Sequence, residues 1–257
     1  MQWLVIFNKE LLEHLRNFKW IWVPIVFILF AVMDPITTYY LPIILESVGG
    51  MPEGASIDIP SPPPAEAMMM SFNQLSVLGV LIAVVISMGM VSSELKSGVY
   101  ELILSKPVSY IHYITAKYAA MSVLVSISLV ISLIAGWYYV TLLFGDIAFS
   151  QLLVSAIFYV IWFLLVLSIV MMFNTMFRSQ GLVAFISIIV ILAINIITSI
   201  YSHVLTWSPA LISDYIGIYL FSGNMETEMW MSVLISVILM VVALTIAITT
   251  LKNRAIE

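Results

Sequence analysis

The chain of 257 residues contains no cysteine, three histidines and only nine lysine and arginine residues. The absence of cysteine excludes disulfide bonds, thiolate metal sites and lipid attached to cysteine. His14, His112 and His203 are scattered along the chain and form no ligand cluster. There is no phosphate-binding loop motif, serine-protease-like triad or metalloprotease motif, and no basic surface for nucleic acid. These absences predict that the chain is not itself an enzyme and that it carries no metal or cofactor.

Long uncharged stretches are what the chain has instead. Hydrophobic residues make up 63% of the sequence and charged residues 9%, which excludes an ordinary soluble globule. Five uncharged intervals of 23 to 35 residues separate Glu66 from Glu94, Lys117 from Asp146, Asp146 from Arg178, Arg178 from Asp214, and Glu228 from Lys252. A sixth apolar stretch precedes them. Roughly 20 apolar residues cross a bilayer as a helix. The sequence therefore predicts an all-α integral membrane protein, a single domain over 1–257, with spans at about 18–40, 68–92, 112–142, 150–174, 181–204 and 229–250.

The basic residues sort to one side of this six-span map. That side holds Lys9, Arg16, Lys19, Lys96, Lys106, Lys117, Arg178, Lys252 and Arg254, while the opposite loops hold Glu46, Glu53, Asp58, Glu66, Asp146, Asp214, Glu226 and Glu228. Cytoplasmic loops carry the excess of lysine and arginine. We therefore expect a multi-pass membrane protein with both termini in the cytoplasm. The first apolar run lacks a small-residue cleavage site and is expected to be retained as a span.

Two segments outside the spans have a helical pattern. Residues 1–17 alternate an apolar face with a charged stripe, which predicts an interfacial helix lying in the headgroup layer; a cytosolic extension of the first span is the alternative. Residues 205–228 combine Ser208-Pro209, a helix-start signal, with several aromatic residues, and predict short helices in the outer leaflet between spans five and six.

Several features allow two interpretations. Asp34-Pro35 suits a helix start near the outer interface, although an acid in the hydrocarbon would suggest ion coupling. The proline- and glycine-rich loop 41–66 is expected to be a linker, or a lid over an external opening. The sixteen methionines suggest a copper site, because thioethers favour Cu(I). No cysteine or histidine accompanies them, however, and methionine is also an adaptable filler of apolar cores.

A polar stripe runs along span five at helical spacing, made by Asn195, Thr198, Ser199 and Ser202. Polar atoms within a bilayer face protein or water rather than lipid. The stripe is therefore a candidate lining for a transport pathway between two chains. The same residue types also join neighbouring helices by hydrogen bonds, so a packing role is the alternative.

The inner loop between spans two and three, residues 92–109, carries the most specific pattern. Val99, Leu102 and Ile103 share one helical face, and Glu94, Ser97 and Glu101 form a polar row. An amphipathic helix this short is not stable alone and is expected to dock in a groove of a partner. Pro107 ends it, and Gly98 is expected to allow a close approach or a positive-φ turn.

This loop resembles that of the permease subunits of ABC-2 type ATP-binding-cassette transporters. The matching residues are Glu94, Ser97, Gly98, Glu101, Leu102, Leu104, Ser105, Pro107, Ser109 and Lys117. The sequence departs from the family pattern at Val99 (usually threonine), Tyr110 (usually arginine) and Ala116 (usually glycine). The outer stretch Gly49-Gly50-Met51-Pro52-Glu53-Gly54, with the proline run that follows, looks like that of small Gram-positive bacterial permeases, which implies a bacterial cell membrane.

The resemblance implies a permease that pairs with a second permease chain, identical or related, in contact with membrane lipid. Its coupling helix, from Glu94 to Pro107 with Val99, Leu102 and Ile103 as apolar anchors, would dock onto a separate cytosolic ATPase, which binds the ATP and magnesium. We expect an exporter. The alternatives are a membrane subunit of an ABC-type sensing or immunity complex and a stand-alone ion carrier; the lack of clear intramembrane charge argues against the carrier.

Overall fold

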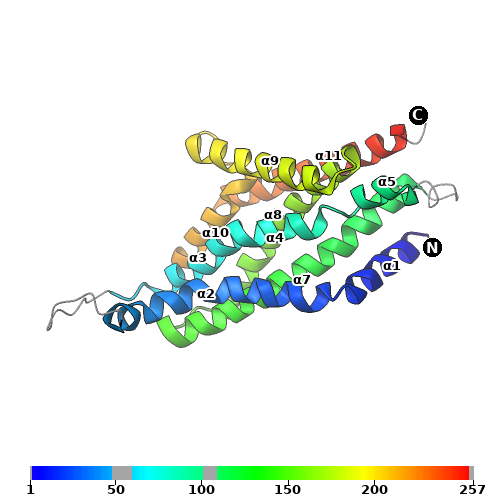
Figure 1. Cartoon of the computed structure of the whole chain (residues 1–257). Helices are drawn as coiled ribbons and strands as arrows, with labels where there is room; N and C mark the ends of the chain where they lie inside the picture. The colour runs from blue at the N-terminus through cyan, green and yellow to red at the C-terminus, as the bar shows by residue number, and fades with distance from the viewer. Residues whose placement is uncertain (1, 48–59, 101–108, 255–257) are drawn as a thin grey trace.

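The computed structural model describes residues 2–47, 60–100 and 109–254. Helices make up nearly all of this part, and it contains no strand. Six of its helices are long and apolar enough to cross a membrane. The prediction of an all-α molecule with six spans is confirmed (Figure 1).

The spans follow one another in chain order. Span one is α2 (Lys19–Ser47). Span two joins α3 (Pro64–Gln74), a π-helical turn η1 (Leu75–Gly79) and α4 (Val80–Ser87), and α5 (Ser92–Ser97) follows beyond a turn at its C-terminal end. Spans three to six are α7 (Tyr110–Phe144), α8 (Phe149–Met176), α9 (Gln180–Ile200) and α11 (Thr227–Arg254). Outside them lie α1 (Gln2–Arg16), before span one, and the 3-10 turn η2 (Pro209–Leu211) with α10 (Ile212–Ser222), between spans five and six.

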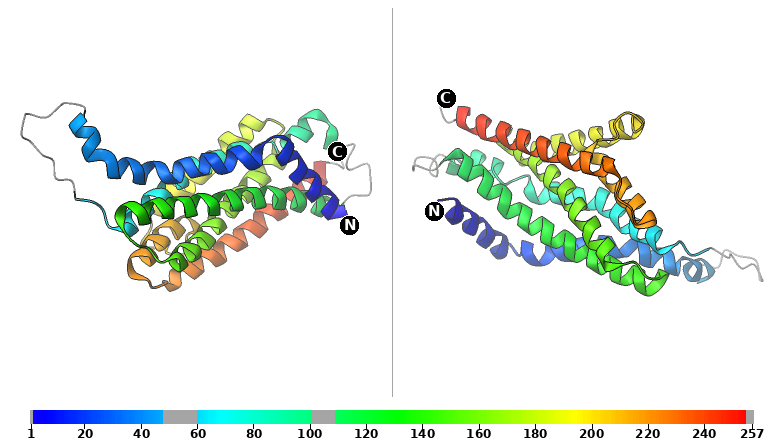
Figure 2. Two further views of the ribbon diagram at one scale, coloured as in Figure 1. Left: turned by 90° about the horizontal axis from the view of Figure 1, so that it is seen from below. Right: turned by 180° about the vertical axis from the view of Figure 1, so that it is seen from behind.

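Helix α8 forms the centre of the bundle, where most of its residues are buried. The most extensive helix pairs are α2 with α7, which run side by side in both views of Figure 2, and α8 with α11. An aromatic cluster ties α8 to span two: Tyr159 packs edge-on against Phe72, with ring centroids 4.9 Å apart, and against Phe163 at 5.3 Å. The Tyr159 hydroxyl donates to the Phe72 carbonyl at 2.8 Å and lies 2.8 Å from Ser76 Oγ. Apolar packing and satisfied polar groups together hold span two to the centre.

Span one corrects one interpretation. Asp34-Pro35 does not start a helix, because α2 continues through Pro24, Pro35 and Pro42 to Ser47. A proline inside a helix removes the hydrogen bond to the carbonyl four residues earlier, and membrane helices tolerate this when a neighbour replaces the donor. Here Ser71 of α3 donates to the Ala31 carbonyl at 2.5 Å, four residues before Pro35. Gly136 of α7 lies beside this contact, where a Cβ atom would stand 3.0 Å from Ser71 Oγ. Pro35 therefore creates a docking point for two other spans.

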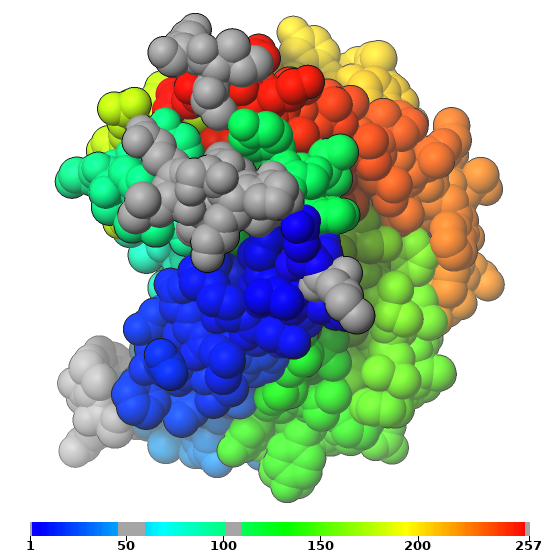
Figure 3. All heavy atoms as spheres, turned by 90° about the vertical axis from the view of Figure 1, so that its right-hand side faces the viewer, coloured from blue at the N-terminus to red at the C-terminus, as the bar shows by residue number. Residues whose placement is uncertain are grey.

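Both ends of the described chain lie at the same end of the bundle as α5 (Figure 1). Helix α1 meets α2 at a sharp bend, where Phe18 adopts a positive φ of 54° that non-glycine residues rarely take. Figure 3 shows this end face-on, with α1 (blue) beside α7 (green). Leu4, Val5 and Leu12 of α1 are exposed, whereas Glu10 and His14 are buried against the bundle. The face of α1 that packs on the bundle therefore combines the buried Glu10 and His14 with partly buried apolar residues such as Phe7 and Leu11.

Candidate functional site

A buried lysine connects three helices at the end of the molecule that carries both termini. Lys117 of α7 is 3% exposed, and its Nζ lies 2.8 Å from an oxygen of Glu10 on α1 and 2.8 Å from an oxygen of Glu94 on α5. Each carboxylate thus comes from a different helix, and one ammonium group contacts both. Burying such charges is costly unless every partner is present. The geometry therefore makes the position of α5 depend on α1 and α7.

Two further groups complete this ion network, which we define as Lys9, Glu10, Glu94, Tyr113 and Lys117. Lys9 Nζ lies 2.9 Å from Glu10 and 3.4 Å from Glu94. The Tyr113 hydroxyl donates to the second oxygen of Glu94. Glu94 therefore receives donors from α1 and from two turns of α7. Trp3 adds a neutral tie between the same helices, since its indole N–H donates to Thr115 at 3.1 Å.

A polar cavity of about 180 Å³ lies beside the ion network. His14 of α1 lines it, is 4% exposed, and has no hydrogen-bond partner for Nδ1 among the described residues. Burial, followed by the nearby charge of Lys19, lowers the pKa of His14 to about 4. The imidazole is therefore neutral near pH 7. Lys19 lies at the start of α2, where its ammonium group donates to the Ile86 carbonyl at 3.2 Å.

Asn174, near the C-terminal end of α8, holds the break between α4 and α5. Its Oδ1 accepts the backbone N–H groups of Val91 and Ser92, both at 3.2 Å. Its Nδ2 donates to the carbonyls of Ser87 and Val170, both at 3.0 Å. The side chain is fully buried and its hydrogen-bonding capacity is used. Asn174 therefore places the start of α5 on the central helix.

The inner loop departs from the predicted single amphipathic helix. Helix α5 ends at Ser97, and Gly98 takes a left-handed conformation with φ 74°, one of its two expected roles. Nothing lies within 4 Å of the place of a Gly98 Cβ atom, so conformation rather than close approach requires glycine here. Because the helix breaks at Gly98, Glu94 and Ser97 lie on a separate helical segment from Val99. Val99 resumes helix and is 40% exposed. The remaining predicted coupling residues, Glu101, Leu102, Ile103, Leu104, Ser105 and Pro107, lie outside the described residues.

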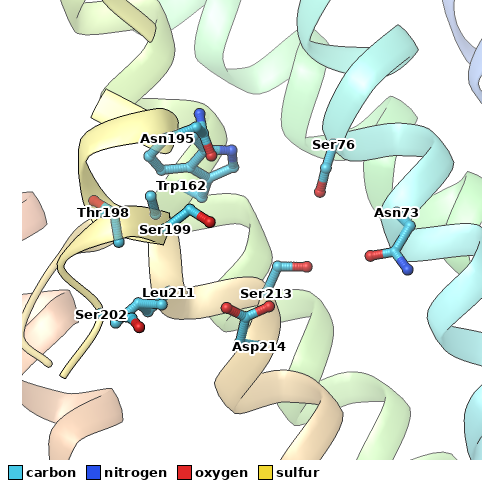
Figure 4. A pocket seen from close by; sticks show the side chains of 11 residues that line it. Asn73, Ser76, Trp162, Asn195, Thr198, Ser199, Ser202, Leu211, Ser213 and Asp214 are labelled. Atoms are coloured by element: carbon cyan, nitrogen blue, oxygen red, sulfur yellow. The ribbon is translucent and has the colours of Figure 1, made fainter. Parts of the chain in front are cut away.

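The polar stripe of span five lies at a second site toward the other end of the bundle. All four of its residues line a cavity of about 390 Å³, together with Asn73, Ser76, Trp162, Ala210, Leu211, Ser213 and Asp214. In Figure 4, Asn73 and Ser76 face the stripe across the cavity, and Ser213 and Asp214 of α10 approach from a third side. We call this space the outer cavity. Residues of span two, α8, α9 and the segment 210–214 meet around it.

The stripe residues are not equivalent. Thr198 is buried, and its hydroxyl lies 2.6 Å from Ser208 Oγ, so it ties α9 to the segment before α10. Asn195 donates to the carbonyl of Ile191 in its own helix at 2.9 Å. Asn195, Ser199 and Ser202 are exposed. The packing role thus describes Thr198, and the lining role stays a prediction for the other three.

An apolar cavity of about 360 Å³ adjoins the outer cavity. It lies between span two and α9 and is lined by Val77, Val80, Leu81, Ile188, Ile191 and Leu192, with Ser76 and Asn195 shared between the two spaces. We call it the apolar cavity. The outer cavity is polar and the apolar cavity is not, and both lie along span two and α9.

Sequence reasoning missed several of these residues. Glu10 and Lys9 were assigned to a membrane-surface helix, and nothing local indicates that they meet Glu94, 84 and 85 residues later. An asparagine within an apolar run, such as Asn174, is a detectable signal, since a buried amide in a membrane needs partners. Within the described residues, no group of three or more histidine, aspartate or glutamate side chains is placed to hold a metal ion.

Comparison with known proteins adds an independent observation. A family model described as ABC-2 family transporter protein matches residues 4–255. An uncharacterized transmembrane protein of Bacillus subtilis (strain 168), YxlG, is 32% identical over 207 residues, which cover 80% of each chain. The matched region includes both cavities and the ion network.

Proposed function

This chain belongs to the ABC-2 family of transporter proteins and is the membrane component of an ABC transporter, and from this premise we propose that it is an export permease driven by a separate cytosolic ATPase. In this proposal the ATP and magnesium are bound by the ATPase. The permease provides the path through the membrane and converts motion of the ATPase into motion of its spans.

The ion network is the observation that carries the proposed coupling. A force applied to α5 acts on Glu94, and Glu94 shares Lys117 with Glu10. Lys117 belongs to α7, a helix of 35 residues that extends across the whole membrane span. Because moving one carboxylate away would leave buried charge unpaired, α1, α5 and α7 are expected to move together. The exposed Val99, next to α5, is the described part of the surface offered to the ATPase.

The path itself is proposed to form between two copies, or two related chains, across α9. Asn195 and Ser199 are exposed on α9, whose other exposed residues are mostly apolar, and Ser202 is exposed just beyond its end. Lipid satisfies none of their hydrogen bonds. A second permease chain would cover α9 and enclose the outer cavity, with lipid around the remaining faces.

The orientation follows from charge. The end that holds the termini also holds Lys9, Arg16, Lys96, Arg178, Lys252 and Arg254, and this end is placed in the cytoplasm of a bacterial cell. The ion network then faces the ATPase, and the outer cavity lies toward the outer surface.

Co-purification tests the proposal. The chain is expressed with ABC ATPases of its source organism, and a partner should co-purify and hydrolyse ATP in the complex. Leu102→Asp is expected to release the ATPase while membrane insertion is retained, because a charge replaces an apolar anchor worth about 1.5–3 kcal/mol when fully buried. Leu102→Ile is the matched control and should retain it. Transport by the chain without any ATPase would instead indicate a stand-alone carrier and overturn the proposal.

A further inference from the structure

The outer cavity has one sign of charge. Of the residues that line it, seven are polar and uncharged, and Asp214 is the charged one; no lysine, arginine or histidine is among them. Asp214 lies in the first turn of α10 and makes no ion pair within the part of the chain that the structure describes. An anionic ligand would meet a carboxylate here without any compensating cation, at the cost of a like-charge contact. The charge pattern therefore favours a positive group.

Two other lining groups suit the same ligand. Trp162 of α8 presents an indole ring, the aromatic side chain that attracts cations most strongly. The Ser213 hydroxyl is buried without a hydrogen-bond partner among the described residues and points into the space in Figure 4. A buried hydroxyl without a partner is a costly arrangement that a bound polar group relieves. Asp214, Trp162 and Ser213 thus line one space with groups that suit an ammonium-like ligand.

The neighbouring apolar cavity specifies the rest of the molecule. Val77, Leu81 and Leu192 give it an aliphatic wall, and it meets the outer cavity at Ser76 and Asn195. Each cavity falls within the usual size of small-molecule sites, roughly 300–1,000 Å³. A ligand that fills both would need a cationic end and an apolar body.

We propose that the permease binds lipophilic cations, with the positive group between Asp214 and Trp162 in the outer cavity and the apolar body in the apolar cavity between span two and α9. This assignment names the class of cargo and rests on the proposed function. It specifies that the cargo carries a positive charge and an apolar body, and both properties follow from residues that the structure describes.

A matched pair of probes tests the charge. Tetraphenylphosphonium and tetraphenylborate have nearly the same size and shape and opposite charge. The purified chain is placed in nanodiscs of zwitterionic lipid without ATPase, and binding is measured by equilibrium dialysis against empty nanodiscs. Saturable binding of the phosphonium, at least tenfold tighter than that of the borate, is expected. Equal binding of the two, or no saturable binding of the phosphonium, overturns the proposal.

Variants locate the site. Asp214→Asn is expected to weaken phosphonium binding at least tenfold, and Asp214→Glu to restore most of it, which separates charge from any effect on folding. Glu226→Gln removes the same charge from the same side outside the cavity lining and should leave binding unchanged. Leu81→Trp fills the apolar cavity and should weaken binding without altering charge. Unchanged binding in both Asp214→Asn and Leu81→Trp would place the cation elsewhere and overturn the assignment.

The outcome is separable from that of the proposed function. Binding is measured on the permease alone, whereas the proposed function is tested by ATPase recruitment. If the ATPase co-purifies and is active but the phosphonium does not bind, the cargo class is wrong and the permease role stands. If the phosphonium binds through Asp214 but no ATPase is recruited, the permease role fails at its coupling end.

Discussion

At the scale of single residues, the energetics of the molecule concentrate on Lys117. Its ammonium group is 3% exposed and serves two carboxylates from different helices. Lys9, whose side chain is 52% exposed, contacts the same carboxylates from the solvent side. Replacing the buried lysine should reduce the stability of the fold much more than replacing the exposed one, because water can solvate the carboxylates where the exposed ammonium group was.

Lys117→Met is therefore expected to destabilise the permease by about 3–5 kcal/mol, since Glu10 and Glu94 lose their buried partner. Lys9→Met is the matched control, with an expected loss of about 1 kcal/mol or less. The measurement is the free energy of unfolding of each purified variant in the same detergent. Equal effects of the two substitutions would show that burial does not distinguish the two lysines.

His14 predicts a response to acid. Its pKa is lowered from 6.5 to about 4, chiefly by burial and then by Lys19. A group whose folded pKa is depressed contributes fully above its unfolded pKa, and the contribution is lost as pH falls from about 6.5 toward 4. At pH 5 the loss is about 2 kcal/mol, at about 1.4 kcal/mol for each pH unit.

The loss should appear as weaker docking of α1, measured by hydrogen exchange of α1 amides at pH 7.5 and pH 5. The His14→Gln variant has a neutral side chain at both pH values, so the part of the increase in α1 exchange at pH 5 that is due to His14 should disappear. The carboxylates Glu10, Glu13 and Glu94 are present in both proteins, so the difference between wild type and variant isolates His14. An identical acid response in both proteins would contradict the prediction.

At the scale of helices, the sequence predicted the membrane spans well and the points where helices break or continue poorly. A span follows from apolar length alone, which is why six crossings were predictable. The break between α4 and α5 and the continuation of α2 through Pro35 depend on partners distant in sequence, Asn174 for the former and Ser71 for the latter. The polar stripe was visible from helical spacing, but the bond from Thr198 to Ser208 was not, because it requires the fold of the segment after α9.

Asn174 gives a prediction for the joint. Asn174→Leu keeps similar volume but leaves the backbone N–H groups of Val91 and Ser92 without their acceptor. With four hydrogen bonds lost at about 0.5–1.5 kcal/mol each, the expected destabilisation is about 2–6 kcal/mol. The placement of α5 should suffer most, so ATPase activity in the complex should fall more than membrane insertion.

Ser168→Ala is the matched control, since that buried hydroxyl bonds within its own helix to the Leu165 carbonyl. It should cost about 1 kcal/mol or less and leave ATPase activity intact. If Asn174→Leu behaves like this control, the joint is held by packing alone.

At the scale of the whole molecule, the end with the termini holds the ion network, and the other end holds the outer cavity, which is lined mainly by hydroxyl and amide groups. The absence of cysteine makes accessibility directly measurable. Cysteine at Asn195 should react with a small water-soluble thiol reagent faster than cysteine at Ile196, by about tenfold. Both positions are exposed on α9, but Asn195 lines the outer cavity and Ile196 does not.

The contrast is measured in membranes, with a cysteine at Gly54 expected to react from outside and one after Glu257 only in opened vesicles. A C-terminal cysteine that reacts from outside would refute the orientation. Equal, negligible labelling at residues 195 and 196 would assign Asn195 to packing.

The contact between Ala31 and Ser71 has a consequence for how the chain is made. Synthesis delivers α2 to the membrane before α3, so the Ala31 carbonyl freed by Pro35 first enters lipid without a donor. An unsatisfied carbonyl in hydrocarbon costs several kcal/mol. That cost disappears when Ser71 arrives, and a shift of α3 by one residue along α2 would bring it back. The first two spans are therefore expected to leave the insertion machinery as a pair, already held in register by a single serine.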